Sequence, residues 1–253
     1  MRGPISRGIL PLAYLCSTKF DQEWDKELDS SFSATETGKL DLSRIGGFTL
    51  VHGHLKIDPV SKRIEGLNII SNRGDKGRIL VPKGTSSDTS EDNKSWVHSK
   101  GEQSLNDDIE HKSTFGLSNS LFNHPWSKVT LGESLLDDLV DKALAKGMTE
   151  DDLVSGCFDL LSHDTYPKEL LHEPNFEKKF NALRYSIFIP PLKTGMLPDS
   201  QDTTMGSLYG TRMQTVILLN KNGDLKYYER DLHLSDIMDQ LKVSTLSFEF
   251  NIA

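Results

Sequence analysis

Two polar residues in the 253-residue sequence lie where a sharp turn meets a strand-like apolar run. Asn119 ends the segment 113–119, and Arg212 precedes the apolar run 215–219. An amide and a guanidinium both offer N–H donors, and the guanidinium adds a positive charge, so these residue types can bind an anion. Asn119 also fits an ordinary loop and Arg212 an ordinary surface charge, and the local pattern leaves that alternative open.

The histidine and cysteine side chains are the other groups that could bind a metal or act as a nucleophile. His52 and His54 would share one face of a strand, where two imidazoles suit a metal or a haem iron, but no third ligand is identifiable. Cys16 and Cys157 lie on apolar stretches without metal or redox spacing, so we expect both to be buried free thiols that pack in the core. We therefore assign no metal site and no cysteine nucleophile.

Several short motifs resemble, in order and spacing, those of the NRDE family, also called the transport and Golgi organisation protein two family. The main matches are Gly116-Leu-Ser-Asn119 with Pro125-Trp126, and Tyr209-Gly-Thr-Arg212 with Thr215 to Leu218, Gly223 and Glu229-Arg230. Weaker matches are Ser6-Arg7-Gly8, Gly47-Phe48 with Leu50, and Asn72-Arg73-Gly74. The family's opening Met-Cys, Asn-Arg-Asp-Glu and Gly-Thr-Trp segments have no counterpart, so we expect the N-terminal part of the family pattern to be missing.

The resemblance implies an α+β fold like that of the N-terminal-nucleophile hydrolases, an αββα layered sandwich, here incomplete at its N-terminus. In the cysteine branch of those enzymes the first residue after Met removal is the nucleophile, and its own α-amino group is the base. Carried over by motif, Asn119 would be the oxyanion donor and Arg212 the late arginine. Removing Met1 exposes Arg2, which cannot attack an acyl carbon. Asn119 and Arg212 are therefore remnant oxyanion or ligand-site candidates, and no residue is assigned as catalytic.

Three functional hypotheses follow from this resemblance. The first is a non-catalytic trafficking or carrier protein linked to Golgi organisation, protein secretion, and haem or lipid mobilisation, with haem or another small amphipathic ligand as cargo. In this carrier hypothesis the Arg212 guanidinium would bind a propionate or acyl carboxylate. The second is a cysteine amide hydrolase whose nucleophile lies upstream of Met1. The third is an incomplete, poorly soluble product with exposed apolar faces.

Charge and hydrophobicity restrict the kind of partner and the cellular compartment that we expect for this protein. A net charge of −8 and a pI near 5.5 argue against nucleic-acid binding, which needs a concentrated basic face. No run approaches the roughly 20 apolar residues that span a bilayer. The stretch 9–16 follows Arg2 and Arg7 like a short signal sequence, but Pro11 interrupts it and a buried helix is the better interpretation. We expect a cytoplasmic protein that associates with the Golgi or mitochondria.

The expected organisation is a single NRDE-family domain over 1–253, with a polar, disordered insertion at about 84–112. Periodicity predicts helices over 6–17, 20–30 and 127–146, and another that starts at the capping box of Thr149 and buries Leu153, Cys157, Leu160 and Leu161. Strands are predicted over 47–57, 66–71, 78–81, 183–189 and 243–250. A hairpin is predicted at Asn222-Gly223, with both residues at positive φ in a type I′ turn.

Overall fold

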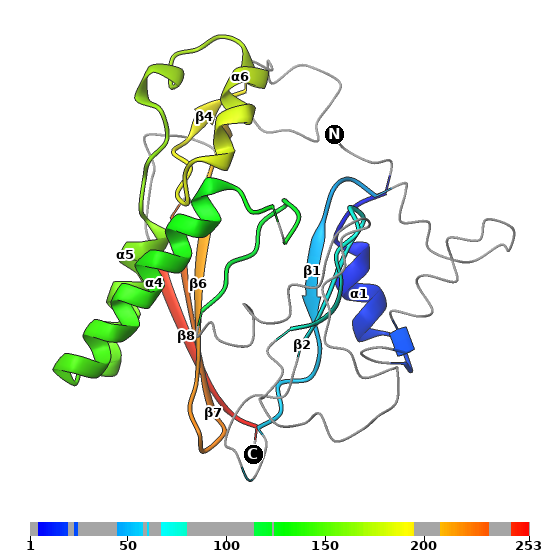
Figure 1. Cartoon of the computed structure of the whole chain (residues 1–253), viewed down its shortest axis with the longest axis vertical. Helices are drawn as coiled ribbons and strands as arrows, with labels where there is room; N and C mark the ends of the chain where they lie inside the picture. The colour runs from blue at the N-terminus through cyan, green and yellow to red at the C-terminus, as the bar shows by residue number, and fades with distance from the viewer. Residues whose placement is uncertain are drawn as a thin grey trace, which may run out of the picture. The chain divides into compact units, whose positions relative to one another are not determined.

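The computed structural model describes residues 5–19, 23–24, 45–57, 60, 67–79, 114–122, 124–194, 208–232 and 244–252. The chain forms two compact units, the first made of residues 1–113 and 117–125, the second of residues 114–116 and 126–252. Both mix helices with small antiparallel sheets (Figure 1). Most of the predicted helix over 20–30 and the whole insertion predicted at about 84–112 lie outside the described residues.

The first unit packs one short helix against a three-stranded sheet. Its elements are α1 (Ile9–Leu15), β1 (Thr49–His52), β2 (Leu67–Ser71) and β3 (Lys76–Ile79), with antiparallel strands in the order β1-β2-β3. Leu10 and Tyr14 are four residues apart, so they share one face of α1. That face packs into a core with Trp24, Ile45, Phe48 and Ile70. The helix lies beside β1 and β2 in Figure 1, where it is drawn in dark blue.

Three predictions for this unit are wrong. The strand predicted over 47–57 ends at His52, because Gly53 takes φ 147° and leaves the extended conformation. His52 is buried with its ring centroid 4.9 Å from that of Tyr14, whereas His54 is exposed beyond the strand, so the two imidazoles do not share a strand face. Cys16 is exposed at the C-cap of α1, since a residue two positions after Tyr14 faces away from the buried side.

The second unit contains a helical pair, a segment of short helical turns and two sheets. Its elements are α4 (Ser127–Lys146), α5 (Glu150–Leu161), the 3₁₀ helix η3 (Lys168–Leu170), α6 (Phe176–Asn181), the 3₁₀ helix η4 (Ala182–Arg184), β4 (Leu192–Lys193), β5 (Leu208–Tyr209), β6 (Met213–Leu219), β7 (Asp224–Asp231) and β8 (Ser244–Asn251). Strands β4 and β5 pair, and the larger sheet has the order β6-β7-β8, all antiparallel.

The boundary between α4 and α5 follows the predicted signals. Gly147 ends α4 in the left-handed conformation at φ 59°. Thr149 then begins α5 with a complete capping box, in which its side chain and that of Asp152 each accept from the other residue's backbone N–H. Both signals are local, so the sequence predicted them correctly.

One face of the β6-β7-β8 sheet packs against α5. Phe158 is 2% exposed and forms a small core with Val154 and Val216, while the Arg230 guanidinium lies 4.0 Å from the Phe158 ring centroid. The buried line of α5 therefore runs through Val154 and Phe158. The four residues predicted for the inner face are only partly buried: Leu153, Cys157, Leu160 and Leu161.

The opposite face of this sheet is apolar and exposed. Ile217, Tyr227 and Phe248 stand opposite one another across the three strands. Ile217 is 53% exposed and Phe248 is 50% exposed, and Met213, Leu246 and Phe250 are exposed on the same side. Residues two apart on a strand share a face, so the sheet buries one side and presents the other as an apolar surface.

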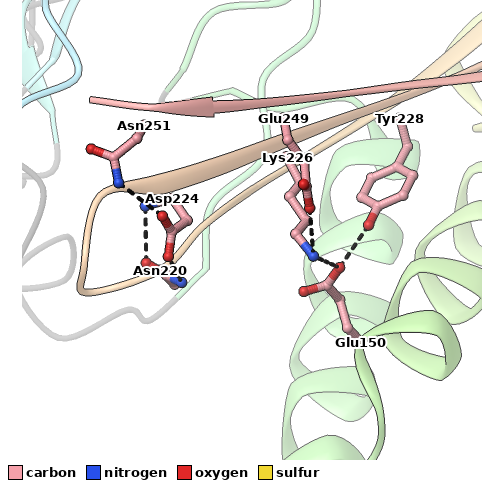
Figure 2. A network of polar contacts seen from close by, with 7 residues as sticks. All are labelled: Glu150, Asn220, Asp224, Lys226, Tyr228, Glu249 and Asn251. Carbon is pink, nitrogen blue, oxygen red and sulfur yellow. Dashed lines mark hydrogen bonds and ion pairs between the residues drawn. The ribbon is translucent and has the colours of Figure 1, made fainter. Parts of the chain in front are cut away.

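A polar network fixes the start of α5 to the sheet (Figure 2). The Glu150 carboxylate accepts from Lys226 Nζ at 2.8 Å and from Tyr228 Oη at 2.7 Å, and Lys226 also pairs with Glu249 at 2.9 Å. The hydrogen bond from Lys226, and then that from Tyr228, lowers the pKa of Glu150. The hydrogen bonds to Glu150 and Glu249 raise the pKa of Lys226. Helix and strands are thus joined through one exposed ion-pair cluster.

The predicted hairpin between β6 and β7 is confirmed, but its turn differs. Gly223 N donates to Asn220 O at 3.1 Å, so Lys221 and Asn222 are the central residues, and Gly223 follows them at φ 88°. Asn220 Oδ1 accepts from the backbone N–H groups of Asn222 and Asp224. This side-chain turn, which the strand pattern does not reveal, shifts the loop by one residue from the type I′ prediction.

The strand predicted over 183–189 is wrong. The chain there forms η4 and then an irregular segment. Ser186 is fully buried and its hydroxyl accepts from Thr165 N at 2.9 Å, while Phe188 N donates to His163 O at 3.0 Å. The segment bonds to the loop after α5, and Leu183 and Ile189 are buried without forming a sheet ladder.

Candidate functional site

The turn between β2 and β3 organises the surroundings of Asn119 in the first unit. Asn72 Nδ2 donates to Ile45 O at 3.1 Å, and Asn72 Oδ1 accepts from Phe48 N at 3.2 Å. One side chain thereby satisfies two backbone groups of the segment before β1. Asn72 therefore fixes the path of residues 45–48 against the turn.

A buried carboxylate connects the same turn to the chain that follows Asn119. Asp75 is 1% exposed, and its Oδ2 accepts from Ser71 Oγ at 3.0 Å. Its Oδ1 accepts from Phe122 N at 3.1 Å, across 47 residues of chain. Gly74 takes φ 121° within this turn, a conformation that favours glycine. The turn thus holds the loop of residues 117–122 by a charge-assisted hydrogen bond.

Arg73 supplies a second connection to that loop. Its Nη1 donates to Asn119 O at 2.6 Å. A Cβ on Gly47 would lie 3.1 Å from Arg73 Nη2 and 3.3 Å from Asn119 Nδ2, so glycine is what permits this close approach. The Asn-Arg-Gly and Gly-Phe motifs, which were recognised only as family matches, thus position Asn119.

Asn119 lines a cavity of about 450 Å³, a size typical of small-molecule sites, which span about 300–1,000 Å³. Arg7, Gly47, Phe48, Thr49, Leu50 and Leu117 are among the other lining residues. Asn119 Oδ1 and Thr49 Oγ1 are buried atoms with no hydrogen-bond partner, and Asn119 Nδ2 has no acceptor among the described residues. A buried amide oxygen without a partner is costly, and a ligand group that donates a hydrogen bond to it would relieve that cost.

Arg212 lies in the second unit. It follows Gly210 and Thr211, which contact the backbone of Ile189 and Pro190. Thr211 N donates to Ile189 O at 2.8 Å, and Ile189 N donates to Thr211 Oγ1 at 2.9 Å. A Cβ on Gly210 would lie 3.0 Å from both Ile189 O and Pro190 O, so the motif glycine is required for this contact. The Arg212 side chain is exposed. Asn119 and Arg212 thus belong to different units, and each remains a separate candidate.

The cysteines do not form a nucleophilic site. Cys157 is half-buried, and burial raises the pKa of its thiol, which lowers the thiolate fraction. In the part of the chain that the structure describes, no group of three or more His, Cys, Asp or Glu side chains is arranged to hold a metal ion. No helix within the described ranges combines the length and apolarity needed to cross a membrane.

Sequence reasoning found Asn119 through a motif but assigned no role to Arg7. Arg7 lines the same cavity, and its Nη1 donates to Gly47 O at 3.4 Å. These residues are 40 positions apart, so no local periodicity connects them. The one signal in the sequence was the Ser6-Arg7-Gly8 match, which carries no chemistry by itself.

The fold and the cavity define a mixed α and β protein with an amide donor held by long-range contacts, and its motifs place it in a known class. The family model for Transport and Golgi organisation 2 matches residues 1–234, and the chain belongs to this family. The resemblance seen in the sequence is therefore confirmed.

Three relatives show how far the similarity extends. An uncharacterized protein of Saccharomyces cerevisiae is 25% identical over 237 residues, which cover 91% of this chain and 66% of that protein. The Mus musculus Transport and Golgi organization 2 homolog is 27% identical over 139 residues, 55% of this chain and 45% of its own length. The Homo sapiens homolog is 25% identical over the same shares. The chain thus spans less than two thirds of the length of each relative.

Proposed function

We propose that this chain is a non-catalytic carrier or trafficking factor in transport and Golgi organisation, and that it binds a small amphipathic ligand in the cavity beside Asn119. Membership of the family supports the general trafficking role. The observation that carries the ligand-binding proposal is the unpaired Asn119 amide at a cavity of about 450 Å³. Haem and lipids are the ligand classes we propose, with action in the cytoplasm at the Golgi or mitochondria.

The cavity has apolar as well as polar walls. Leu10, Pro11, Leu50 and Val51 line it together with Asn119. An apolar wall beside one polar group that fixes orientation is the usual arrangement of a small-molecule site. A ligand with an apolar body and one polar end matches this arrangement.

We also propose that the second unit contributes one helix layer and one sheet layer of an αββα sandwich. Helix α5 packs on one face of the β6-β7-β8 sheet, and the other face presents Ile217, Phe248 and Phe250. A sheet with one helix-covered face and one apolar face is what an inner layer of such a sandwich requires.

Titration of the purified chain with haem and with a fluorescent fatty acid tests the carrier function. We expect saturable binding that Asn119→Ala weakens about tenfold, because a hydrogen bond to a charged group contributes about 1.5–3 kcal/mol. Asn181→Ala, an asparagine in the second unit, is the matched control. Failure of both ligands to bind would refute the carrier proposal. The separate Arg212 hypothesis fails if Arg212→Ala binds both ligands like the unchanged chain.

Amide hydrolysis is the second candidate function, because an unpaired amide donor is also what an oxyanion hole requires. It needs a nucleophile that is not Cys16 or Cys157. Incubation of the purified chain with an acyl amide tests it, and turnover that Asn119→Ala abolishes would favour this candidate over the carrier.

A further inference from the structure

Two arginines near Asn119 have no carboxylate partner among the residues that the structure describes. Within those residues, Arg7 donates to the carbonyl of Gly47 and Arg73 donates to the carbonyl of Asn119. Neither guanidinium pairs with a carboxylate of the described residues. Each backbone carbonyl uses one N–H of a group that has five. Toward the described residues, most of the donors of both side chains therefore remain unused.

Gly47 is the point at which these groups meet. Arg7 Nη1 lies 3.4 Å from its carbonyl oxygen. Arg73 Nη2, Asn119 Nδ2 and Asn119 Oδ1 lie 3.1 Å, 3.3 Å and 3.4 Å from the position that a Cβ would take on it. Two positive groups and an amide therefore lie around one glycine, whose missing side chain leaves space beside Arg73 and Asn119. A bound anion would be attracted by both guanidinium groups.

We propose that Arg7, Arg73 and the Asn119 amide form an anion-binding site, and that it takes the oxyanion headgroup, carboxylate or phosphate, of an amphipathic ligand. This inference rests on the carrier function proposed above and adds the chemistry of the headgroup. A guanidinium holds a carboxylate or a phosphate through two parallel N–H donors. The Nδ2 group of Asn119 would add a third hydrogen-bond donor to the headgroup. The apolar tail then lies along Leu10, Pro11, Leu50 and Val51.

Thr49 extends the same arrangement toward the tail. Its buried Oγ1 has no hydrogen-bond partner in the described part of the chain, and Thr49 lines the cavity together with Gly47 and Leu50. A hydroxyl can donate to a headgroup oxygen as well as accept. The polar groups thus belong to the segment 47–49 and the loop at Asn119, whereas Leu10 and Pro11 of α1 supply apolar wall.

Equilibrium binding of three probes with the same ten-carbon tail tests this inference: decanoate, decyl phosphate and decanol. For the unchanged chain we expect at least one anion to bind about tenfold more tightly than decanol, with an advantage that shrinks as salt is added. The preferred anion identifies the headgroup. Arg7→Gln should remove most of the advantage. Arg184→Gln is the matched control, because Arg184 is also exposed and also bonds to one backbone carbonyl.

Gly47→Ala provides an independent variant. Its methyl group should occupy the space between Arg73 and Asn119 and weaken the favoured anion at least about tenfold, while decanol binding stays unchanged. Gly132→Ala in the second unit is its control, because a Cβ there meets only Ile187 Cδ1 at an ordinary 3.5 Å. Thermal unfolding of each variant reports on the fold. The neutral probe keeps the test informative, because a collapsed cavity would lose decanol as well.

The outcomes separate the two proposals. Equal affinity of the unchanged chain for all three probes would overturn the anion site and leave the carrier function standing. An anion preference that survives both Arg7→Gln and Gly47→Ala would also overturn it. If none of the probes, haem included, binds the unchanged chain, the carrier function fails and the anion site fails with it.

Discussion

Replacing Asp75 should loosen the loop that carries Asn119. Asp75 is 1% exposed, and its carboxylate accepts from Ser71 Oγ and from Phe122 N. In Asp75→Ala the Ser71 hydroxyl still accepts from the backbone N–H groups of Arg73 and of residue 75, but its O–H no longer donates to a carboxylate. The amide of Phe122 likewise loses its bond to the Asp75 carboxylate.

The magnitude for the loop follows from the lost bond between Phe122 N and the carboxylate. A hydrogen bond to a charged group contributes about 1.5–3 kcal/mol, so we expect Asp75→Ala to destabilise the attachment of the loop by about 2 kcal/mol. Because 1.4 kcal/mol is a factor of ten, hydrogen exchange at the Phe122 amide should speed up by about 30-fold. Exchange at the amides of α5, in the other unit, should not change.

The isosteric variant is the control for this measurement. Asp75→Asn keeps an oxygen that can accept from Phe122 N, so its effect should stay near 1 kcal/mol or below, the value of a neutral hydrogen bond. The reasoning is refuted if Asp75→Ala leaves exchange at Phe122 unchanged, or if both variants change it equally. Either result would mean that the carboxylate does not hold the loop.

Three further predictions concern the second unit. Phe158→Ala, which empties a 2% exposed site, should lower the free energy of unfolding by about 3–5 kcal/mol in urea titrations, whereas Phe158→Leu should cost much less. The pKa of Glu150 is lowered in the fold by Lys226, so its stabilisation is present above its ordinary pKa and is lost as pH falls through the folded value. Glu150→Gln should therefore flatten the acid side of a stability profile recorded between about pH 3 and 7, and an unchanged slope would contradict the assignment. Gly210→Ala forces a methyl group to 3.0 Å from two backbone carbonyl oxygens and should lower the melting temperature, whereas Gly132→Ala within α4 meets its nearest atom at 3.5 Å and should raise it.

Local signals in the sequence predicted the helical pair of the second unit well. The predicted helix over 127–146 has the bounds of α4, and the left-handed Gly147 and the Thr149 capping box mark the ends that they predict. Each depends on residues fewer than five positions apart. The hairpin of β6 and β7 followed from alternation, but its turn depends on the Asn220 side chain, which the strand pattern does not include.

Predictions that depended on the environment of a residue did less well. The segment 183–189 forms a 3₁₀ turn and irregular chain in place of a strand, because Ser186 and Phe188 bond to residues more than 20 positions earlier. Cys16 is exposed although its neighbours are apolar. Similarly, the sequence supplied Asn119 by motif but not Arg7 as its neighbour, since the two come together only through Gly47. Long-range hydrogen bonds of this kind have no periodicity to detect.

The hydrogen bonds around Gly47 also bear on how this region folds and varies in length. They close loops of 40 residues from Arg7 to Gly47 and 46 residues from Arg73 to Asn119, whereas the α4–α5 pair closes over a few residues. Contacts of high sequence separation form slowly. During synthesis the cavity should therefore be completed only after residue 122 has been made, well after the α1 and β1 segments. The entropy of closing a loop grows only with the logarithm of its length, and doubling the 46-residue loop would cost about 0.6 kcal/mol. Relatives are therefore free to lengthen or shorten the chain between the β2–β3 turn and Asn119 while keeping the same cavity.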